Sequence, residues 1–298
     1  MTEQEEEAAW MNRTLKKISV FVVCAMLLLS AVLCGGCTAG DDALANGTEP
    51  LTVTILKVGK ADAIIIRNGD HTVLIDAGEE DDGEEVTEFL QQQGADRIDL
   101  MIITHFDKDH VGGADTVAEE IAVDQILLPD YEGTSTEYLD FMETVEAGGI
   151  PVRRLAEPYQ VTIGDMDLLT EPPQSYDTNG VEGEFDNNFS LITTITHGEN
   201  RLLFTGDIEK SRIREWLAGG TVQPCDFLKV PHHGIYNRAT EELVKAVQPK
   251  YAVICSSEKN PAETNTLETL KAYGVDVLQT KDGDITVVSD GKKITMHQ

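Results

Sequence analysis

Basic residues are scarce in this sequence, which has 23 Lys and Arg against 53 Asp and Glu and a formal net charge of −30. The average surface therefore repels anionic polymers and anionic lipid. No stretch interleaves basic and aromatic residues as a groove for long nucleic acid would. Any polyanion must be met at a locally positive site, and bound metal is one way to make one.

Cysteines and long apolar runs are also few. Three of the five cysteines lie within the first 40 residues, and only Cys225 and Cys255 lie further on. This excludes a disulfide framework and a thiolate metal site, and leaves two buried thiols or at most one bridge. Beyond residue 36 nothing approaches 18 consecutive apolar residues, so we expect no bundle of membrane helices that could form a channel.

The first 50 residues predict export. Residues 1–10 are acidic and read as a mis-assigned extension, whereas "MNRTLKK" from Met11 is basic and precedes an apolar run that ends in Gly-Gly-Cys. The pattern resembles a bacterial lipoprotein signal over 11–36, with Cys37 lipidated and 37–50 a flexible tether. Cys34 departs from the usual leucine-like residue, so a plain membrane anchor and a cleaved, secreted form stay open. Each alternative places the rest of the chain on the extracytoplasmic side of the cell membrane.

From Leu51 the sequence alternates predicted strands and helices. Apolar strands such as "DLMIIT" and "FLKVP" are separated by segments with helical spacing, and the order of strands then helices occurs twice. Two sheets packed face to face with helices outside would satisfy this order. We predict one α/β (α+β) domain over 51–298, a four-layer αββα sandwich.

Acids and histidines follow the apolar strands with unusual consistency. They occupy loops, where a rigid scaffold can aim functional side chains. In chain order these residues are Asp76 after "VLI", His105 after "LMIIT", Asp207 after "LLFTG", and His232 and His233 after "FLKVP".

The segment "THFDKDHVGG" concentrates this pattern, with two histidines and two aspartates within six residues. His105 with Asp107 is spaced to hold one ion and Asp109 with His110 a second. Two ions about 3.5–4 Å apart can share an activating hydroxide and stabilise the departing oxygen of a displacement. The alternative is a helix N-terminus with Asp caps and solvated histidines. It explains any one residue but explains the whole set poorly.

This segment resembles the signature loop of the metallo-β-lactamase superfamily, His-x-His-x-Asp-His, with Asp at the place of the second histidine. The stretches "ILKVGKADAIIIRNGDHTVLIDAG", "NNFSLITTITHGENRLLFTGDIE" and "LKVPHHG" are similar to the extracellular hydrolase domain of ComEC-type competence proteins. The resemblance implies an αββα sandwich with a dinuclear centre between its sheets.

The resemblance also implies roles for the polar residues. The expected ligands are His105 and Asp107 for the first ion, Asp109 and His110 for the second, Asp207 bridging both, and His232 or His233 completing the second site.

Two further residues take roles from the same resemblance. Asp76 is expected to orient the loop without binding an ion. Asn188 stands where relatives have a third histidine at the first site. The oxygens of Asp107 and Asn188 shift that site from zinc toward manganese or magnesium. Asp109, Asp207 and Asn188 are thus the catalytic candidates, with two divalent ions (zinc or manganese, with magnesium an option) as cofactors.

The remaining histidines are predicted to be solvated: His71 and His197 in turns and His297 near the C-terminus. His197→Ala is therefore expected to do little, and Lys229 is interpreted as a structural residue of its strand.

Three functions stay open on this sequence. The first is a metal-dependent phosphodiesterase or nuclease acting on a phosphodiester or nucleic-acid fragment, since two ions neutralise a phosphate. The resemblance, to a domain linked with DNA degradation outside the membrane, supports it. The second is hydrolysis of another exported substrate, such as a wall-polymer phosphoester, a lactone or a β-lactam. The third is a non-catalytic binding lipoprotein. No protein partner is predictable.

Overall fold

The computed structural model describes residues 48–179, 182–220 and 222–298. The predicted extension, signal peptide, lipidated Cys37 and almost all of the tether lie outside the described residues. Within them, no helix combines the length and the apolar character that a membrane span requires. The first strand, β1 (Leu51–Ile55), begins at the first residue of the predicted domain.

One sheet has eight strands in the order β17-β16-β1-β2-β3-β5-β7-β8. Neighbours from β17 to β3 pair antiparallel, and those from β3 to β8 pair parallel. After β1 its strands are β2 (Ala63–Asn68), β3 (His71–Ala77), β5 (Leu100–Ile102), β7 (Ile126–Pro129), β8 (Val152–Leu155), β16 (Ile285–Ser289) and β17 (Ile294–His297).

The second sheet has seven strands in the order β15-β14-β13-β12-β11-β10-β9, and it too is parallel in one half and antiparallel in the other. Its strands are β9 (Tyr159–Ile163), β10 (Met166–Glu171), β11 (Ile192–His197), β12 (Asn200–Phe204), β13 (Phe227–Lys229), β14 (Tyr251–Ile254) and β15 (Asp276–Gln279). A small parallel pair joins β4 (Arg97–Ile98) to β6 (Ala122–Val123).

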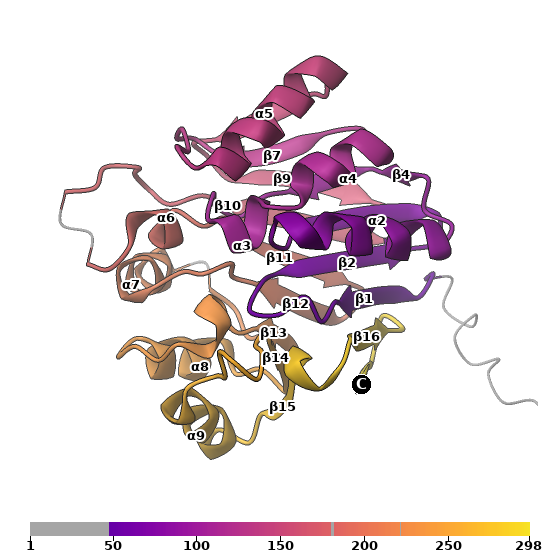
Figure 1. The fold of residues 1–298 in the computed structure, drawn as a ribbon. Coiled ribbons are helices and arrows are strands. Elements are labelled where there is room, and N and C mark those ends of the chain that lie inside the picture. The colour runs from indigo at the N-terminus through magenta and orange to yellow at the C-terminus, as the bar shows by residue number, and fades with distance from the viewer. Residues whose placement is uncertain (1–47, 180–181, 221) are drawn as a thin grey trace, which may run out of the picture. The chain divides into compact units, whose positions relative to one another are not determined.

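Helices cover the outer faces of both sheets (Figure 1). On the eight-stranded sheet these are α2 (Gly83–Gln92), α3 (Lys108–Val111), α4 (Ala114–Glu120) and α5 (Thr136–Gly148); on the other they are α7 (Lys210–Ala218), α8 (Thr240–Val247) and α9 (Thr264–Ala272). The short helical elements among the described residues are η2 (Glu80–Asp82), α6 (Phe185–Asn188), η3 (Pro231–Gly234) and η4 (Thr280–Asp282). In α5 the hydroxyl of Ser135 accepts a hydrogen bond from Tyr138 N at 3.2 Å, and the helix ends at Gly149 with φ 61°.

Three apolar layers separate these four layers of secondary structure. Successive strand residues point to opposite faces, so Ile64 and Ile66 of β2 pack between the sheets while Ile65 packs under the helices. In β12, Leu202 faces the other sheet and Leu203 faces α7 and α8. The predicted α+β four-layer sandwich is confirmed.

The register of the parallel strands brings the polar loops together. Ile75 of β3 pairs with Ile102 of β5, so Asp76 and the His105 loop leave the eight-stranded sheet at neighbouring points. In the other sheet Phe204 pairs with Lys229, and Asp207 follows the first strand as the histidine pair follows the second. Loops from both sheets therefore meet at one end of the sandwich.

Candidate metal centre

Asp76 is the buried anchor of the site. Its backbone has φ 57°, a conformation that non-glycine residues rarely adopt, and its side chain is inaccessible to solvent. The backbone N of Thr104 donates to Oδ1 at 2.7 Å, and the Thr104 hydroxyl donates to Oδ2 at 2.8 Å. His110 Nδ1 lies 2.8 Å from the same Oδ2. Asp76 thus holds His110 by one ring nitrogen and leaves the other facing the centre.

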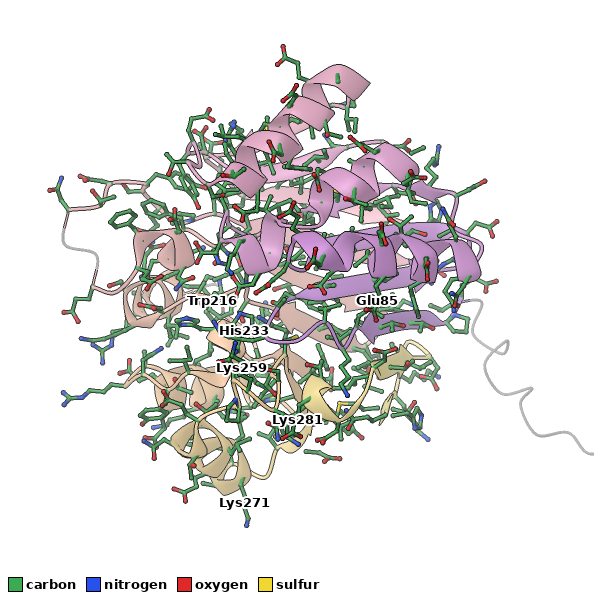
Figure 2. All side chains as sticks on the ribbon, viewed as in Figure 1. Glu85, Trp216, His233, Lys259, Lys271 and Lys281 are labelled. Carbon is green, nitrogen blue, oxygen red and sulfur yellow. The ribbon has the colours of Figure 1, made fainter. Side chains whose placement is uncertain are left out.

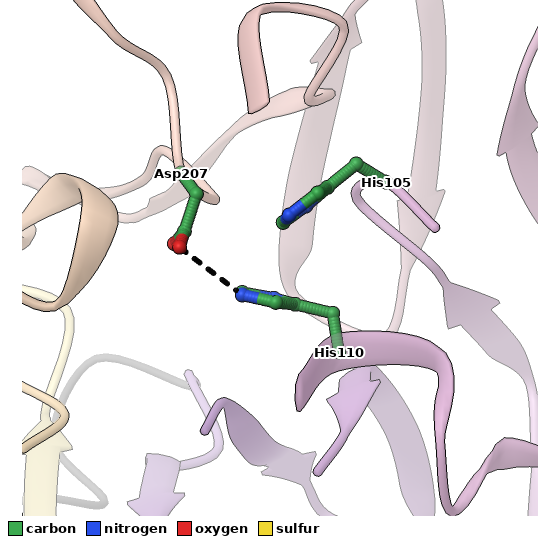
Figure 3. A group of neighbouring side chains, drawn as sticks. All are labelled: His105, His110 and Asp207. Atoms are coloured by element: carbon green, nitrogen blue, oxygen red, sulfur yellow. Dashed lines mark ion pairs between the residues drawn. The ribbon is translucent and has the colours of Figure 1, made fainter. Parts of the chain in front are cut away.

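His105 is oriented by the same chain of hydrogen bonds. Because the Thr104 hydroxyl donates to Asp76, its oxygen accepts from His105 Nδ1, which lies 3.0 Å away. The rings of His105 and His110 lie 4.1 Å apart, centroid to centroid. Figure 3 shows both rings turned toward Asp207, whose Oδ2 is 3.3 Å from His110 Nε2.

His233 supplies the third inward-facing imidazole. Its Nδ1 lies 3.2 Å from the carbonyl oxygen of Cys255, and its Nε2 lies 2.9 Å from Asp207 Oδ2 and 3.3 Å from Asp109 Oδ2. The residue has φ 51° within η3, and its side chain is buried. Figure 2 labels its place in the fold. His232 stays outside, with Nδ1 3.3 Å from Glu209 Oε1. Of the two histidines left open by the sequence, the structure brings His233 to the cluster.

Lys229 and Asp62 lie directly behind this cluster, and neither was predicted to have a role at the site. Both side chains are buried and form an ion pair, and Lys229 Nζ also lies 3.3 Å from Asp207 Oδ1. The interpretation of Lys229 as a structural strand residue missed this contact. A signal was present, because alternation along β13 puts Lys229 on the same inward face as Phe227.

Charges inside the site hold one another in place. Burial raises the pKa of Asp207, but the neighbouring His233, His110 and Lys229 outweigh it and hold this pKa well below its usual range. Burial alone would lower the pKa of Lys229. The carboxylates of Asp62 and Asp207 raise this pKa by more than burial lowers it, so the lysine is charged. For His110 the same competition between burial and the surrounding carboxylates raises the pKa.

These side chains fit a divalent metal. Within the described chain, the buried Nε2 atoms of His105, His110 and His233 have no hydrogen-bond partner, and each has its Nδ1 beside an acceptor. Ligand atoms of His105, His110 and Asp207 lie within 4.8 Å of one another, as do those of Asp109, His110 and His233. Imidazole nitrogen with carboxylate oxygen is a donor set for zinc, manganese and iron.

The sequence family agrees with this geometry. The model of the metallo-beta-lactamase superfamily matches residues 56–258. The chain belongs to the metallo-beta-lactamase superfamily. Members of this superfamily are mostly hydrolases, and the fold typically binds divalent metals, often two.

Three curated relatives are competence or recombination proteins by name. The chain is 28% identical over 197 residues to ComE operon protein 3 of Bacillus subtilis (strain 168), covering 64% of this chain and 24% of that protein. It is 27% identical over 215 residues to Recombination protein 2 of Haemophilus influenzae, covering 70% and 24%, and 25% identical over 245 residues to Competence protein ComA of Neisseria gonorrhoeae, covering 76% and 30%. The chain therefore spans less than a third of the length of these relatives.

Solved structures show the same superfamily fold. The metallo-beta-lactamase fold protein YhfI from Bacillus subtilis aligns with a TM-score of 0.54 at 12% identity, covering 84% of this chain and 100% of that one. CmlA, a diiron beta-hydroxylase from Streptomyces venezuelae, aligns with a TM-score of 0.50 at 15% identity, covering 78% and 52%. At these identities the likeness concerns the fold alone.

Two members of the expected superfamily ligand set are placed differently from the rest. Asp107 lies at the edge, with Oδ2 3.5 Å from His105 Nε2 and a side chain that is 34% exposed. Asn188 is not brought to the cluster. Its Nδ2 donates to the carbonyls of Glu182 and Glu184 at 3.2 and 2.7 Å, and its Oδ1 accepts from Arg212 N at 3.0 Å. Both ends of the amide are thus engaged, Nδ2 within its own loop and Oδ1 at the start of α7, so this structure does not offer Asn188 in its expected role as ligand or catalytic residue.

The expectation of three solvated histidines also needs correction. His197 is fully buried, with Nδ1 2.8 Å from Ser289 Oγ and Nε2 2.9 Å from the Glu49 carbonyl oxygen. The turn is local, but the residues that cover it are nearly 100 and 150 positions away, which local sequence cannot reveal. His71 is partly exposed and contacts Asp99 at 3.0 Å, and His297 is exposed.

Proposed function

We propose that this chain is an exported hydrolase that cleaves phosphodiesters, most directly those of nucleic-acid fragments, at a dinuclear metal centre. The observation that carries the proposal is the convergence of three buried, unpartnered imidazole nitrogens of the described chain on the carboxylate of Asp207. Such nitrogens fixed at their far side by acceptors are built to bind a cation rather than each other.

The charge of the site favours bound cations. Five carboxylates gather here; they are Asp62, Asp76, Asp107, Asp109 and Asp207. Two ammonium groups face them, because Lys229 contacts Asp62 and Asp207 and Lys60 Nζ lies 3.5 Å from Asp109 Oδ2. The carboxylates outnumber the ammonium groups, so divalent cations would offset negative charge that remains. Uncompensated charge is costly in a largely buried site.

The residues then have separate tasks. Asp109, His110 and His233 would hold one ion and His105 and Asp107 the other, and the carboxylate of Asp207 would be available to both. When bound, the two ions supply a nucleophilic hydroxide at neutral pH and neutralise the phosphate. Asp76 and Thr104 fix the imidazoles, and Lys229 holds Asp207 by its other oxygen.

Oxygen ligands favour a hard metal in part of the site. Asp107 stands where the superfamily motif has an imidazole, and the amide of Asn188 is engaged elsewhere, so we propose manganese ahead of zinc at that position. The names of the curated relatives link this type of domain to competence and recombination. They support a nucleic-acid fragment as substrate.

Stripped protein reconstituted with manganese or zinc tests the proposal. Hydrolysis of bis-p-nitrophenyl phosphate should return, better with manganese, and should exceed that of nitrocefin or a lactone. Asp207→Asn should lose bound metal and more than about 100-fold in activity, since even residues behind the ligands account for 10–100-fold. Asp124→Asn, in an exposed pair with Arg97, is the matched control. Full metal occupancy in the Asp207 variant would reject the dinuclear assignment, and faster nitrocefin or lactone hydrolysis would reject the phosphodiester.

We further propose that lipid on Cys37 tethers the domain to the outer side of the cell membrane, as the N-terminal sequence predicts. Mass spectrometry of the membrane fraction tests this. An unmodified Cys37 in a chain that retains Met11 would indicate an anchor instead.

A further inference from the structure

A pocket of about 560 Å³ opens beside the candidate metal centre. Asp107 belongs to both, because its carboxylate faces His105 in the cluster and also lines the pocket. The other walls come from the segment between β7 and α5 and from the segment that includes α6. A substrate whose scissile bond lies at the cluster would place its neighbouring group here.

Aromatic rings form the apolar part of this pocket, which we call the aromatic pocket; they are Phe106, Tyr131, Tyr176, Phe185 and Phe189. Phe106 and Phe189 are only 3% and 4% exposed, and Tyr131 packs between them at centroid distances of 4.6 and 5.2 Å. Phe185, in contrast, is 50% exposed and lies 6.4 Å from Phe189. The buried rings thus support the exposed ring of Phe185 from one side. This arrangement suits stacking of a planar group better than an aromatic cage around a cation.

Acidic residues form the polar part. Asp107, Glu132, Glu137 and Asp186 line the aromatic pocket, and Lys108 is its one basic lining residue in the described chain. Lys108 is mostly exposed, with Nζ 3.8 Å from Glu79. This charge repels a phosphate from the pocket and leaves the metal centre as the place for it. A neutral planar group attached to that phosphate meets no such penalty.

We infer that the aromatic pocket binds an unstacked nucleobase next to the phosphodiester at the metal centre. This inference rests on the proposed phosphodiesterase function and gives it a substrate class, a single-stranded fragment as short as one nucleotide. Stacking on Phe185 accepts any base, because every base has a π-face. Duplex is disfavoured, since its bases are already stacked and paired and must first be extruded.

Two chromogenic esters with the same leaving group test the inference on the manganese-loaded protein. Thymidine 5′-(p-nitrophenyl phosphate) carries a base, and methyl p-nitrophenyl phosphate does not. The ratio of their kcat/KM values should favour the nucleotide in the wild type. It should fall about tenfold in Phe185→Ala, the size expected for one lost stacking contact, and be kept in Phe185→Tyr. Leu139→Ala removes an equally exposed apolar side chain outside the pocket and should keep the ratio.

Free thymidine gives a second measurement. It should inhibit hydrolysis of the methyl ester competitively in the wild type and about tenfold more weakly in Phe185→Ala. A ratio unchanged by Phe185→Ala, or inhibition by choline in place of thymidine, would overturn the base pocket while the phosphodiesterase function stood. Hydrolysis of neither ester would remove both proposals together.

Discussion

The two halves of the candidate metal centre are built differently. In the enclosed half, Asp109, His110 and His233 come from loops of both sheets, and two imidazoles face carboxylate oxygens at 2.9–3.3 Å. In the open half, His105 is buried but Asp107 is one-third exposed and borders the aromatic pocket. On the proposed dinuclear centre, the enclosed half would hold its ion more tightly and the open half would be the side that substrate reaches.

The open half has fewer candidate ligands because the amide of Asn188 is engaged elsewhere. Its amide joins the chain before α6 to the start of α7. The neighbouring Asn187 donates to Glu209 at 3.4 Å, and its buried Oδ1 has no partner among the residues described. An oxygen-rich, partly solvated position is a weaker and harder site than one with two imidazoles.

The largest expected effect comes from removing one candidate carboxylate ligand from each half in turn. Asp109→Ala should lose more metal than Asp107→Ala and reduce phosphodiester hydrolysis by more than about 100-fold. Asp107→Ala should retain about one ion per chain, because the enclosed half keeps all its own side chains. Metal analysis after dialysis measures both. Equal metal loss from the two variants would contradict the difference between the halves.

The buried ion pair between Lys229 and Asp62, behind the cluster, offers a second test of how the enclosed half is held together. Lys229→Met or Asp62→Asn alone should lower the free energy of unfolding by about 3–5 kcal/mol, because each removes one side of a buried ion pair. The double variant should regain most of this stability, as measured by urea unfolding.

Metal affinity separates two roles of Lys229. If it also orients Asp207, the double variant should remain about 10–100-fold weaker in metal binding, since the contact to Oδ1 is still missing. A double variant with both stability and metal affinity restored would show that Lys229 only neutralises Asp62. Calorimetric titration with manganese measures the difference.

Much of the fold was predictable because strand alternation and helical spacing are local signals. The same holds for Asp76, His105, Asp109, His110 and Asp207, which follow apolar strands and do meet in the structure. Lys229 and Asp62 were missed because their partners come from different sheets, and only the register of both reveals the contact. His233 could not be separated from His232 because their backbone conformations, with φ 51° and 50°, depend on the packing of η3.

The smallest effect is expected outside both halves, at His197. His197→Ala should cost about 1–3 kcal/mol of stability, because it removes two buried hydrogen bonds, and should leave metal content unchanged. Burial lowers the pKa of His197 even though the Glu49 carbonyl and Asp165 raise it. The unfolded state therefore binds the proton more readily, and stability present above about pH 6.5 is lost as the pH falls through the folded pKa.

The difference in unfolding free energy between wild type and His197→Ala should thus shrink toward acid pH. Urea unfolding at several pH values measures it, and ligand histidines present in both proteins cancel in the difference. A gap that widens on acidification, or loss of metal from the variant, would contradict this assignment.

The candidate ligands come from opposite sheets of the sandwich, His105 and His110 from one and Asp207 and His233 from the other. Bound ions would therefore cross-link two sheets that otherwise meet through apolar side chains. Each ion at 100 times its dissociation constant would add about 2.7 kcal/mol to folding. The thermal midpoint of this protein would then report the free metal of its surroundings, and a chelator would loosen the whole sandwich as well as stop its chemistry.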